Sequence, residues 1–247
     1  MKITVIGATG QIGSKVVELL RAEGHDVVAA SRDTGADVLT GAGLTEALTG
    51  AQVLVDVVNS PSFDDDPVLR FFSASSANLV AAAKKTGVGH YVALSIVGAD
   101  GLPDSGYMRA KVVQERTIAA SGVPYTIVRA TQFQEFADAI TDSLVVDGEV
   151  RAPDALIQPI ASADVSAAVA HVAVTEPVGG IVDLGGPDKI SFADMARTVL
   201  ARRGADTPVV VDPSATYFGT HVDDHSLVTG SGATLASTRF ADGVASR

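Results

Sequence analysis

The sequence contains no cysteine among its 247 residues, which excludes disulfide bonds, thiolate metal sites and cysteine nucleophiles together. This composition fits a reducing cell interior. The five histidines are interpreted as structural or solvent-exposed residues, because neutral imidazoles readily occupy edges and caps. No metal site is therefore predicted.

Positive charge is also scarce, since 18 lysines and arginines stand against 29 aspartates and glutamates, a formal net charge of −11. A surface of this sign repels a phosphate backbone, so nucleic acid is not expected as a partner. No stretch approaches the roughly 18 apolar residues of a membrane-spanning helix, and the N-terminal apolar run is too short for a signal peptide. We therefore expect a soluble, cytoplasmic protein with no membrane partner.

The N-terminal stretch from Lys2 to Gly13 carries the strongest signal in the chain. Residues 2–6 are a short apolar, β-branched run, as in a strand buried on both faces of a parallel sheet. Gly7, Gly10 and Gly13 follow, where the chain must turn, let a ligand approach the backbone and pack a helix against the sheet. The first amides of that helix would bind phosphate, so the stretch predicts a dinucleotide site. An ordinary βαβ turn is the alternative.

Length and hydrophobic patterning predict one α/β domain over residues 1–247, with a Rossmann-type, doubly wound parallel sheet. Beyond the first strand, the predicted strands are residues 25–30, 36–39, 52–58, 90–95, 125–130, 181–184 and 209–211. The predicted helices are residues 11–20, 44–48, 66–85, 107–121, 132–144, 162–174 and 191–203. A small C-terminal lobe, formed mainly by residues 131–160 and 185–247, is expected to bind the substrate, because the strand–helix alternation loosens there.

The residues after the second predicted strand bear on the choice of cofactor. An acidic residue at this place holds the ribose hydroxyls of NAD, whereas an arginine can pair with the 2′-phosphate of NADP. Ser31 and Arg32 stand there, so NADPH is predicted in preference to NADH, with a solvated loop arginine beside Asp33 as the alternative. Val58 and Asn59 end the fourth predicted strand and are expected along the cofactor, because ligands bind at the carboxyl edge of such sheets.

Tyr107 and Lys111 are four residues apart in a predicted helix, which places them one turn apart on the same face. A nearby ammonium favours the charged phenolate, so it would lower the pKa of the phenol from about 10 toward the working pH. Ser95 ends the preceding strand at the same edge of the sheet. These three residues are candidates for acid–base chemistry, with a chance surface pair as the alternative for Tyr107 and Lys111.

The G-x-x-G-x-x-G loop and the set of Ser95, Tyr107 and Lys111 resemble the short-chain dehydrogenase/reductase superfamily, and in detail its atypical, NmrA-like NAD(P)H-binding branch. The resemblance implies that Tyr107 exchanges a proton with the substrate oxygen and that Ser95 hydrogen-bonds this oxygen. It implies that Lys111 holds the nicotinamide ribose and tunes Tyr107. The cofactor-binding residues predicted in all are Gly7, Thr9, Gly10, Gln11, Ile12, Gly13, Ser31, Arg32, Asp37, Val38, Val58, Asn59, Lys111 and Ala130.

Within that set, Asp37 and Val38 are carried over from the family as adenine contacts, and a turn aspartate is the alternative for Asp37. Three features depart from the family pattern. Ser95 precedes Tyr107 by only twelve positions, and Ala130-Thr131 replaces the usual Pro-Gly. The family's helical asparagine has no clear counterpart, because Asn78 lies late in its helix.

The resemblance predicts NADP(H)-dependent hydride transfer to or from a small carbonyl or quinone-like molecule, with Tyr107 as the acid–base group. The NmrA-like branch includes inactive cofactor sensors, so a non-catalytic redox sensor with a protein partner is the alternative; retention of Tyr107 and Lys111 favours an enzyme. A sugar-nucleotide epimerase is a third option, for which the chain looks short. The helices predicted after the fourth and fifth strands could form a homodimer face, although they show no exposed apolar stripe.

Overall fold

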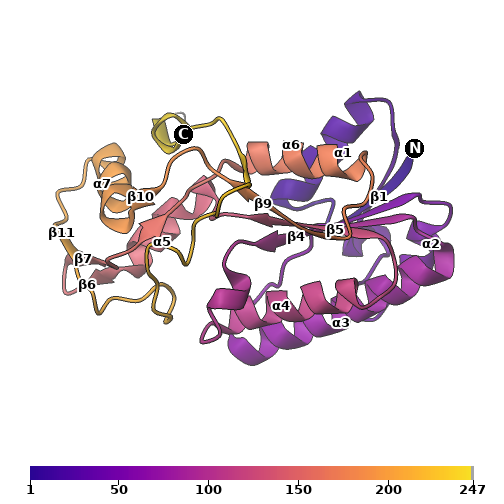
Figure 1. Ribbon diagram of the computed structural model, residues 1–247, viewed down its shortest axis with the longest axis horizontal. Coiled ribbons are helices and arrows are strands. Elements are labelled where there is room, and N and C mark those ends of the chain that lie inside the picture. The colour runs from indigo at the N-terminus through magenta and orange to yellow at the C-terminus, as the bar shows by residue number, and fades with distance from the viewer. Residues whose placement is uncertain (246–247) are drawn as a thin grey trace. The chain divides into compact units, whose positions relative to one another are not determined.

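The computed structural model describes residues 1–245, which fall into two compact units (Figure 1). Unit 1 comprises residues 1–95, 106–129 and 165–182. Unit 2 comprises residues 96–105, 130–164 and the chain from 183 onward. Unit 2 therefore includes the segments predicted for the substrate lobe, whose binding role stays a prediction. Within the described residues, no helix combines the length and the apolarity needed to cross a bilayer.

Unit 1 contains the Rossmann-type core. Its strands are β1 (Lys2–Ile6), β2 (Asp26–Ala30), β3 (Val53–Asp56), β4 (His90–Ile96) and β5 (Tyr125–Ala130), of which the last two end at the boundary of the unit. Its helices are α1 (Gln11–Ala22), α2 (Leu44–Leu48), α3 (Asp65–Thr86), α4 (Gly106–Ala119) and most of α6 (Ser162–Ala173), with one 3₁₀ turn, η1 (Arg32–Thr34).

The main sheet has seven strands in the order β12-β9-β5-β4-β3-β1-β2, where β9 is Gly180–Gly185 and β12 is Thr234–Leu235. Strand β1 pairs in parallel with both β2 and β3, and β3 pairs in parallel with β4. Because the chain winds to one side after β1 and to the other after β2, the ends of β1 and β3 form the switch point at which such sheets bind ligands. The predicted Rossmann-type parallel sheet is confirmed.

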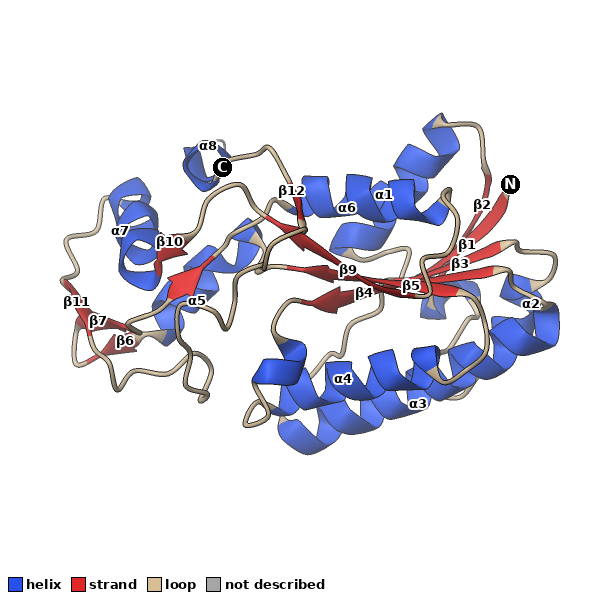
Figure 2. Ribbon diagram, viewed as in Figure 1, coloured by secondary structure: helices blue, strands red, loops and turns tan. Residues whose placement is uncertain are grey.

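Burial on both faces explains why β1 reads as an unbroken apolar run. Ile3, Val5 and Ile6 are at most 1% exposed. Helix α1 contacts β1 and β2 on one face of the sheet, and α3 and α4 pack side by side on the other (Figure 2). The amphipathic pattern of α1 turns Val16 and Leu20 into the core, as expected from their helical spacing.

The strand predicted at residues 36–39 is wrong, because this segment forms a turn. The Asp37 carboxylate accepts a hydrogen bond from the amide of Leu39 at 2.7 Å. The side-chain amide of Asn78 donates to the carbonyls of Val38 and Leu39 at 2.9 and 3.0 Å. An aspartate that bonds nearby backbone amides competes with strand pairing, and this competition decides the local structure.

Unit 2 contains short elements. Its helices are η2 (Ala99–Gly101), η3 (Gln134–Phe136), α5 (Ala137–Ser143), α7 (Phe192–Arg203) and α8 (Phe240–Ala245). Two small sheets, β11-β7-β6 and β10-β8, are built from β6 (Val145–Val146), β7 (Glu149–Ala152), β8 (Leu156–Ile157), β10 (Ile190–Ser191) and β11 (Val209–Val211). The helix predicted at 132–144 is therefore shorter, since α5 begins only after η3.

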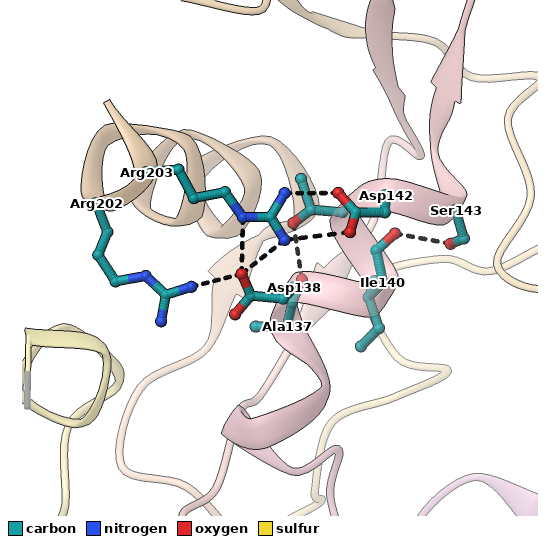
Figure 3. Close-up of polar contacts among 8 residues, drawn as sticks. Ala137, Asp138, Ile140, Asp142, Ser143, Arg202 and Arg203 are labelled. Carbon is teal, nitrogen blue, oxygen red and sulfur yellow. Dashed lines mark hydrogen bonds and ion pairs between the residues drawn. The ribbon is translucent and has the colours of Figure 1, made fainter. Parts of the chain in front are cut away.

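Helices α5 and α7 are joined by a group of four charged side chains (Figure 3). Arg203 contacts Asp138 and Asp142, and Arg202 also contacts Asp138. Burial alone would raise the pKa of Asp138, but the hydrogen bonds from Arg202 and Arg203 outweigh it and hold that pKa below its ordinary value. These ion pairs fix the two helices of unit 2 against each other.

Candidate active site

The glycine loop between β1 and α1 is shaped for a close backbone approach. Gly7 has a φ of +88°, and a Cβ there would lie 3.0 Å from the carbonyl oxygen of Val57. A Cβ on Gly13 would lie 2.1 Å from the carbonyl oxygen of Gly7, so α1 packs directly on the loop. Gly10 caps α1 without a side chain, and the first turn of α1 has no acidic residue. The first amides and the helix dipole therefore suit a phosphate group.

The predicted loop residues are placed as a phosphate site requires. Thr9, Gly10 and Gln11 are exposed, whereas Ile12 and Gly13 are buried in the start of α1. The exposed side of the loop thus presents backbone, and the buried side anchors it.

The end of β2 supplies a second polar group. Ser31 is 8% exposed, and its hydroxyl oxygen is buried with no hydrogen-bond partner in the part of the chain that the structure describes. The adjacent Arg32 side chain is 72% exposed, with its Nε 4.0 Å from a carboxylate oxygen of Asp37. A buried hydroxyl without a partner is uncommon in native proteins, and a loosely paired guanidinium is available to an anion. Ser31, Arg32 and the glycine loop therefore fit an NAD(P)-type dinucleotide.

Asp37 forms a turn, which is the alternative to the adenine contact predicted for it. Val38 and Val58 are half-buried, and both pack against the apolar cluster of Val68, Phe71, Phe72 and Ala110. They belong to one apolar surface beside the sheet edge, which keeps them as candidates for contact with a flat ring.

Tyr107, near the start of α4, lies against an aromatic group. Its ring centroid is 5.4 Å from that of Phe63 and 6.0 Å from that of Phe72. Its hydroxyl donates a hydrogen bond to Asn59 Oδ1 at 3.1 Å, just beyond the end of β3. Burial raises the pKa of Tyr107 to about 12. The expected lowering of this pKa by Lys111 is therefore wrong, and Tyr107 is a protonated hydrogen-bond donor at neutral pH.

Lys111 points into a buried polar group instead. It is 3% exposed, and its ammonium donates to the carbonyl of Leu94 at 2.9 Å and to the side-chain oxygen of Gln114. The ammonium also lies 4.4 Å from the centroid of the Phe72 ring. Burial lowers the pKa of Lys111 to about 8, against the opposing influence of the Asp56 and Glu115 carboxylates.

Asp56, the last residue of β3, accepts hydrogen bonds within the same buried polar group. One of its carboxylate oxygens accepts hydrogen bonds from the Tyr91 hydroxyl and from Gln114 Nε2, both at 2.9 Å. Burial raises the pKa of Asp56, although these bonds and Lys111 oppose the shift. Lys111, Gln114, Asp56 and Tyr91 thus form one chain of hydrogen bonds, which we call the Asp56–Lys111 network. Sequence analysis missed Gln114, whose position three residues after Lys111 was the available signal.

Ser95 belongs to a third set of contacts. Its hydroxyl donates to Glu115 Oε1 at 2.6 Å, and Glu115 forms a buried ion pair with Arg129 through Nε at 2.9 Å and Nη2 at 2.6 Å. Ser95, Tyr107 and Lys111 therefore each have different partners, and within the described chain no hydrogen bond joins any two of them.

Ala130 is the remaining predicted cofactor-binding residue. Ala130 ends β5 in unit 2, is 1% exposed, and accepts a hydrogen bond from the Val97 amide at 2.9 Å. Arg109 forms an ion pair with Asp65 at 2.7 Å. His221 and His225 have the i, i+4 spacing of a metal pair, but the described residues hold no group of three ligating side chains. The absence of a metal site stays a prediction.

Residues 7–177 match the profile of a family described as NAD(P)H-binding. The chain belongs to this NAD(P)H-binding family. It is 30% identical over 222 residues to the NAD(P)H azoreductase of Xenophilus azovorans, a match that covers 82% of this chain and 74% of that protein. It is also 30% identical over 147 residues to the photosystem II assembly factor Ycf39 of Cyanophora paradoxa. That match covers 46% of Ycf39, so the chain aligns with about half the length of this relative.

Solved structures share the fold at low sequence identity. MoeE5 in complex with UDP-glucose and NAD superposes with a TM-score of 0.75 at 20% identity, covering 99% of this chain and 96% of that one. The dTDP-4-dehydrorhamnose reductase of Bacillus anthracis in complex with NADP gives 0.73 at 15% identity, covering 98% and 96%. At these identities the neighbours show the shared fold, which agrees with the resemblance to atypical, NmrA-like short-chain dehydrogenases/reductases predicted from the sequence.

Proposed function

We propose that this protein is an NADP(H)-dependent oxidoreductase that transfers hydride between the nicotinamide and a small carbonyl or quinone-like substrate. The observation that carries the proposal is the position of the Tyr107 hydroxyl. It bonds Asn59 directly beyond Val57 and Val58, the residues that lie closest to the glycine loop at Gly7. A proton donor and a phosphate-binding loop therefore meet at one end of β3 in unit 1.

The cofactor, when bound, supplies the hydride. In the reducing direction, Tyr107 would give its proton to the carbonyl oxygen of the substrate. An alkoxide is a stronger base than a phenolate, so this transfer is favourable even with the pKa of Tyr107 at about 12. Asn59 Oδ1 orients the hydroxyl before the substrate oxygen replaces it as acceptor. Phe63 and Phe72 pack against the phenol ring and offer an apolar wall to a flat substrate.

The preference for NADP rests on Arg32, whose exposed guanidinium follows β2 and lies 4.0 Å from the Asp37 carboxylate, a loose contact that a 2′-phosphate could replace. The first amides of α1 would hold the pyrophosphate, and the Ser31 hydroxyl would supply a further hydrogen bond. The cytoplasmic location, the small-molecule partner and the homodimer stay predictions.

NADPH oxidation with a panel of carbonyl, quinone and azo compounds tests the proposal. Tyr107→Phe should lower kcat/KM by about 100-fold or more, because it removes the proton donor while keeping the ring. Tyr125→Phe is the matched control, since Tyr125 begins β5 at the opposite end of the strand from the ligand edge. Absence of turnover with every compound, or an unchanged rate in Tyr107→Phe, would defeat the proposed chemistry.

A second candidate is a non-catalytic NADP(H) sensor. It is favoured by the separation of Ser95, Tyr107 and Lys111 into three sets of contacts, and two of the relatives are named as assembly factors. Tight NADPH binding without turnover, together with a protein partner whose binding depends on the cofactor, would select it.

The sequence analysis counts the length of the chain against a sugar-nucleotide epimerase, and this argument from length is wrong. The chain superposes on 96% of the UDP-N-acetylglucosamine 4-epimerase of Bacillus cereus, with a TM-score of 0.70 at 18% identity. NAD retained through purification would support an epimerase, and its absence would favour the reductase.

A further inference from the structure

Two buried glutamines of unit 2 have side-chain atoms without hydrogen-bond partners. Gln132 is 4% exposed, and neither its Nε2 nor its Oε1 has a partner among residues 1–245. Gln134 is 1% exposed, and its Oε1 is likewise unpaired there. Three polar atoms within two neighbouring side chains thus lack the bonds that buried groups ordinarily make.

Both glutamines flank one backbone bridge in unit 2. The carbonyl of Gln132 accepts from the Ile160 amide at 2.9 Å, and the amide of Gln134 donates to the Ile160 carbonyl at 2.8 Å. Phe133 between them forms an extended bridge with Ile160. Gln134 begins η3, so the two glutamines lie on either side of this bridge, where an extended segment meets a 3₁₀ turn.

The orientation of the Gln134 amide is fixed. Its Nε2 donates to the carbonyl of Thr238 at 3.1 Å, so the unpaired atom is the oxygen, an acceptor. Gln132 leaves one donor and one acceptor unpaired. The pair therefore offers two acceptors and a donor.

Gln158 shows how unit 2 treats a purely structural glutamine. It is 1% exposed, its Nε2 donates to the Gly186 carbonyl at 2.7 Å, and its Oε1 accepts from the Thr229 amide at 2.8 Å. The fold can thus satisfy a buried amide completely. The unmade bonds at Gln132 and Gln134 set these two residues apart, since unmade buried bonds lower stability and persist where a ligand uses them.

We propose that Gln132 and Gln134 form a binding site for a neutral ligand group that carries both a hydrogen-bond donor and an acceptor, namely a carboxamide or a hydroxyl. A carboxylate is disfavoured, because its negative charge would lie beside two glutamine oxygens that are themselves hydrogen-bond acceptors. A bare carbonyl or quinone oxygen would satisfy Gln132 Nε2 alone and leave both acceptors unpaired. The group belongs to a small-molecule ligand. The site does not depend on hydride transfer, so it can fail or stand apart from the proposed function.

Thermal unfolding of two matched variants tests the unpaired state of Gln132. Gln132→Leu should keep or raise Tm, because it removes buried polar atoms that make no bonds in the protein. Gln158→Leu should lower Tm by several degrees, because it leaves the Gly186 carbonyl and the Thr229 amide without the hydrogen bonds that Gln158 makes to them. A loss of Tm in Gln132→Leu as large as that in Gln158→Leu would overturn the inference.

Binding of two probes of similar size tests the chemistry. Benzamide carries a donor and an acceptor, whereas acetophenone carries the acceptor only. Titration of the full chain, followed by the side-chain amide NMR signals of Gln132 and Gln134, should show these signals moving with benzamide and about tenfold weaker binding of acetophenone. Gln132→Leu should abolish the difference. Equal response to both probes, or no response to either, would contradict the site.

Discussion

The buried ammonium of Lys111 predicts an unusual dependence of stability on pH. Burial lowers the pKa of Lys111 from 10.5 to about 8 in the folded protein, so between these values the unfolded chain binds more protons than the folded one. Stability therefore rises with pH in this window, because the folded state has released a proton that was costly to keep. From pH 7.5 to 9.5 the gain is about 2 kcal/mol.

Urea unfolding of the wild type and Lys111→Met at pH 7.5, 8.5 and 9.5 measures this gain. The variant lacks the titrating group and leaves Asp56 without its cation, so its stability should stay level or fall as the pH rises. Lys85→Met, at an exposed position near the end of α3, is the matched control and should follow the wild type.

The comparison between variants removes the general effect of rising negative charge, which acts on all three proteins alike. If the wild type and Lys111→Met change in parallel from pH 7.5 to 9.5, Lys111 is not the buried ammonium of the Asp56–Lys111 network and the reasoning is refuted.

Three further substitutions test contacts within units 1 and 2. Gly13→Ala should cost about 1–3 kcal/mol and abolish NADPH binding, because its Cβ meets backbone at 2.1 Å, while Gly101→Ala, with open space around it, should do neither. Asn78→Leu should cost about 1–2 kcal/mol in urea unfolding, since two turn carbonyls lose their donor. Asp138→Asn should cost about 1 kcal/mol at pH 7. That difference should vanish as the pH falls through the lowered pKa of Asp138; a cost that persists in acid would contradict the ion-pair account.

Much of unit 1 is predictable because local pattern and tertiary structure agree there. The buried run at β1, the glycines after it and the amphipathic face of α1 each require the same βαβ unit. The segment at 36–39 is the exception, since its apolar residues suggest a strand while Asp37 bonds the backbone of its own turn. A carboxylate that caps amides two residues on is a local signal that hydrophobic pattern alone overlooks.

Unit 2 is less predictable because its elements are short and depend on distant partners. Strand β12 is two residues long and exists through pairing with β9, about fifty positions earlier. Helix α8 likewise lies in a stretch whose composition predicts only loops. Such elements carry too few residues for periodicity to show.

The candidate site divides in the same way. The positions of the loop glycines, Ser31 and Arg32 just beyond β1 and β2 could be predicted from spacing, because backbone geometry restricts what stands there, and their role in binding stays a prediction. The direction of a long side chain could not. Lys111 and Tyr107 share a helix face as predicted, yet the buried Asp56 and Gln114 draw the ammonium inward, and Asn59 takes the hydroxyl. These partners come from other parts of the sequence.

Calorimetric titration with NADPH and NADH tests the central claim, that the amides opening α1 and the guanidinium of Arg32 hold an NADP(H) cofactor. Arg70 provides the control, because its side chain is also 72% exposed and also lies 4.0 Å from an aspartate. We predict saturable one-site binding of NADPH, weakened about tenfold or more in Arg32→Ser and unchanged in Arg70→Ser, with NADH binding equal in all three proteins. Failure of both nucleotides to bind the wild type would contradict the account.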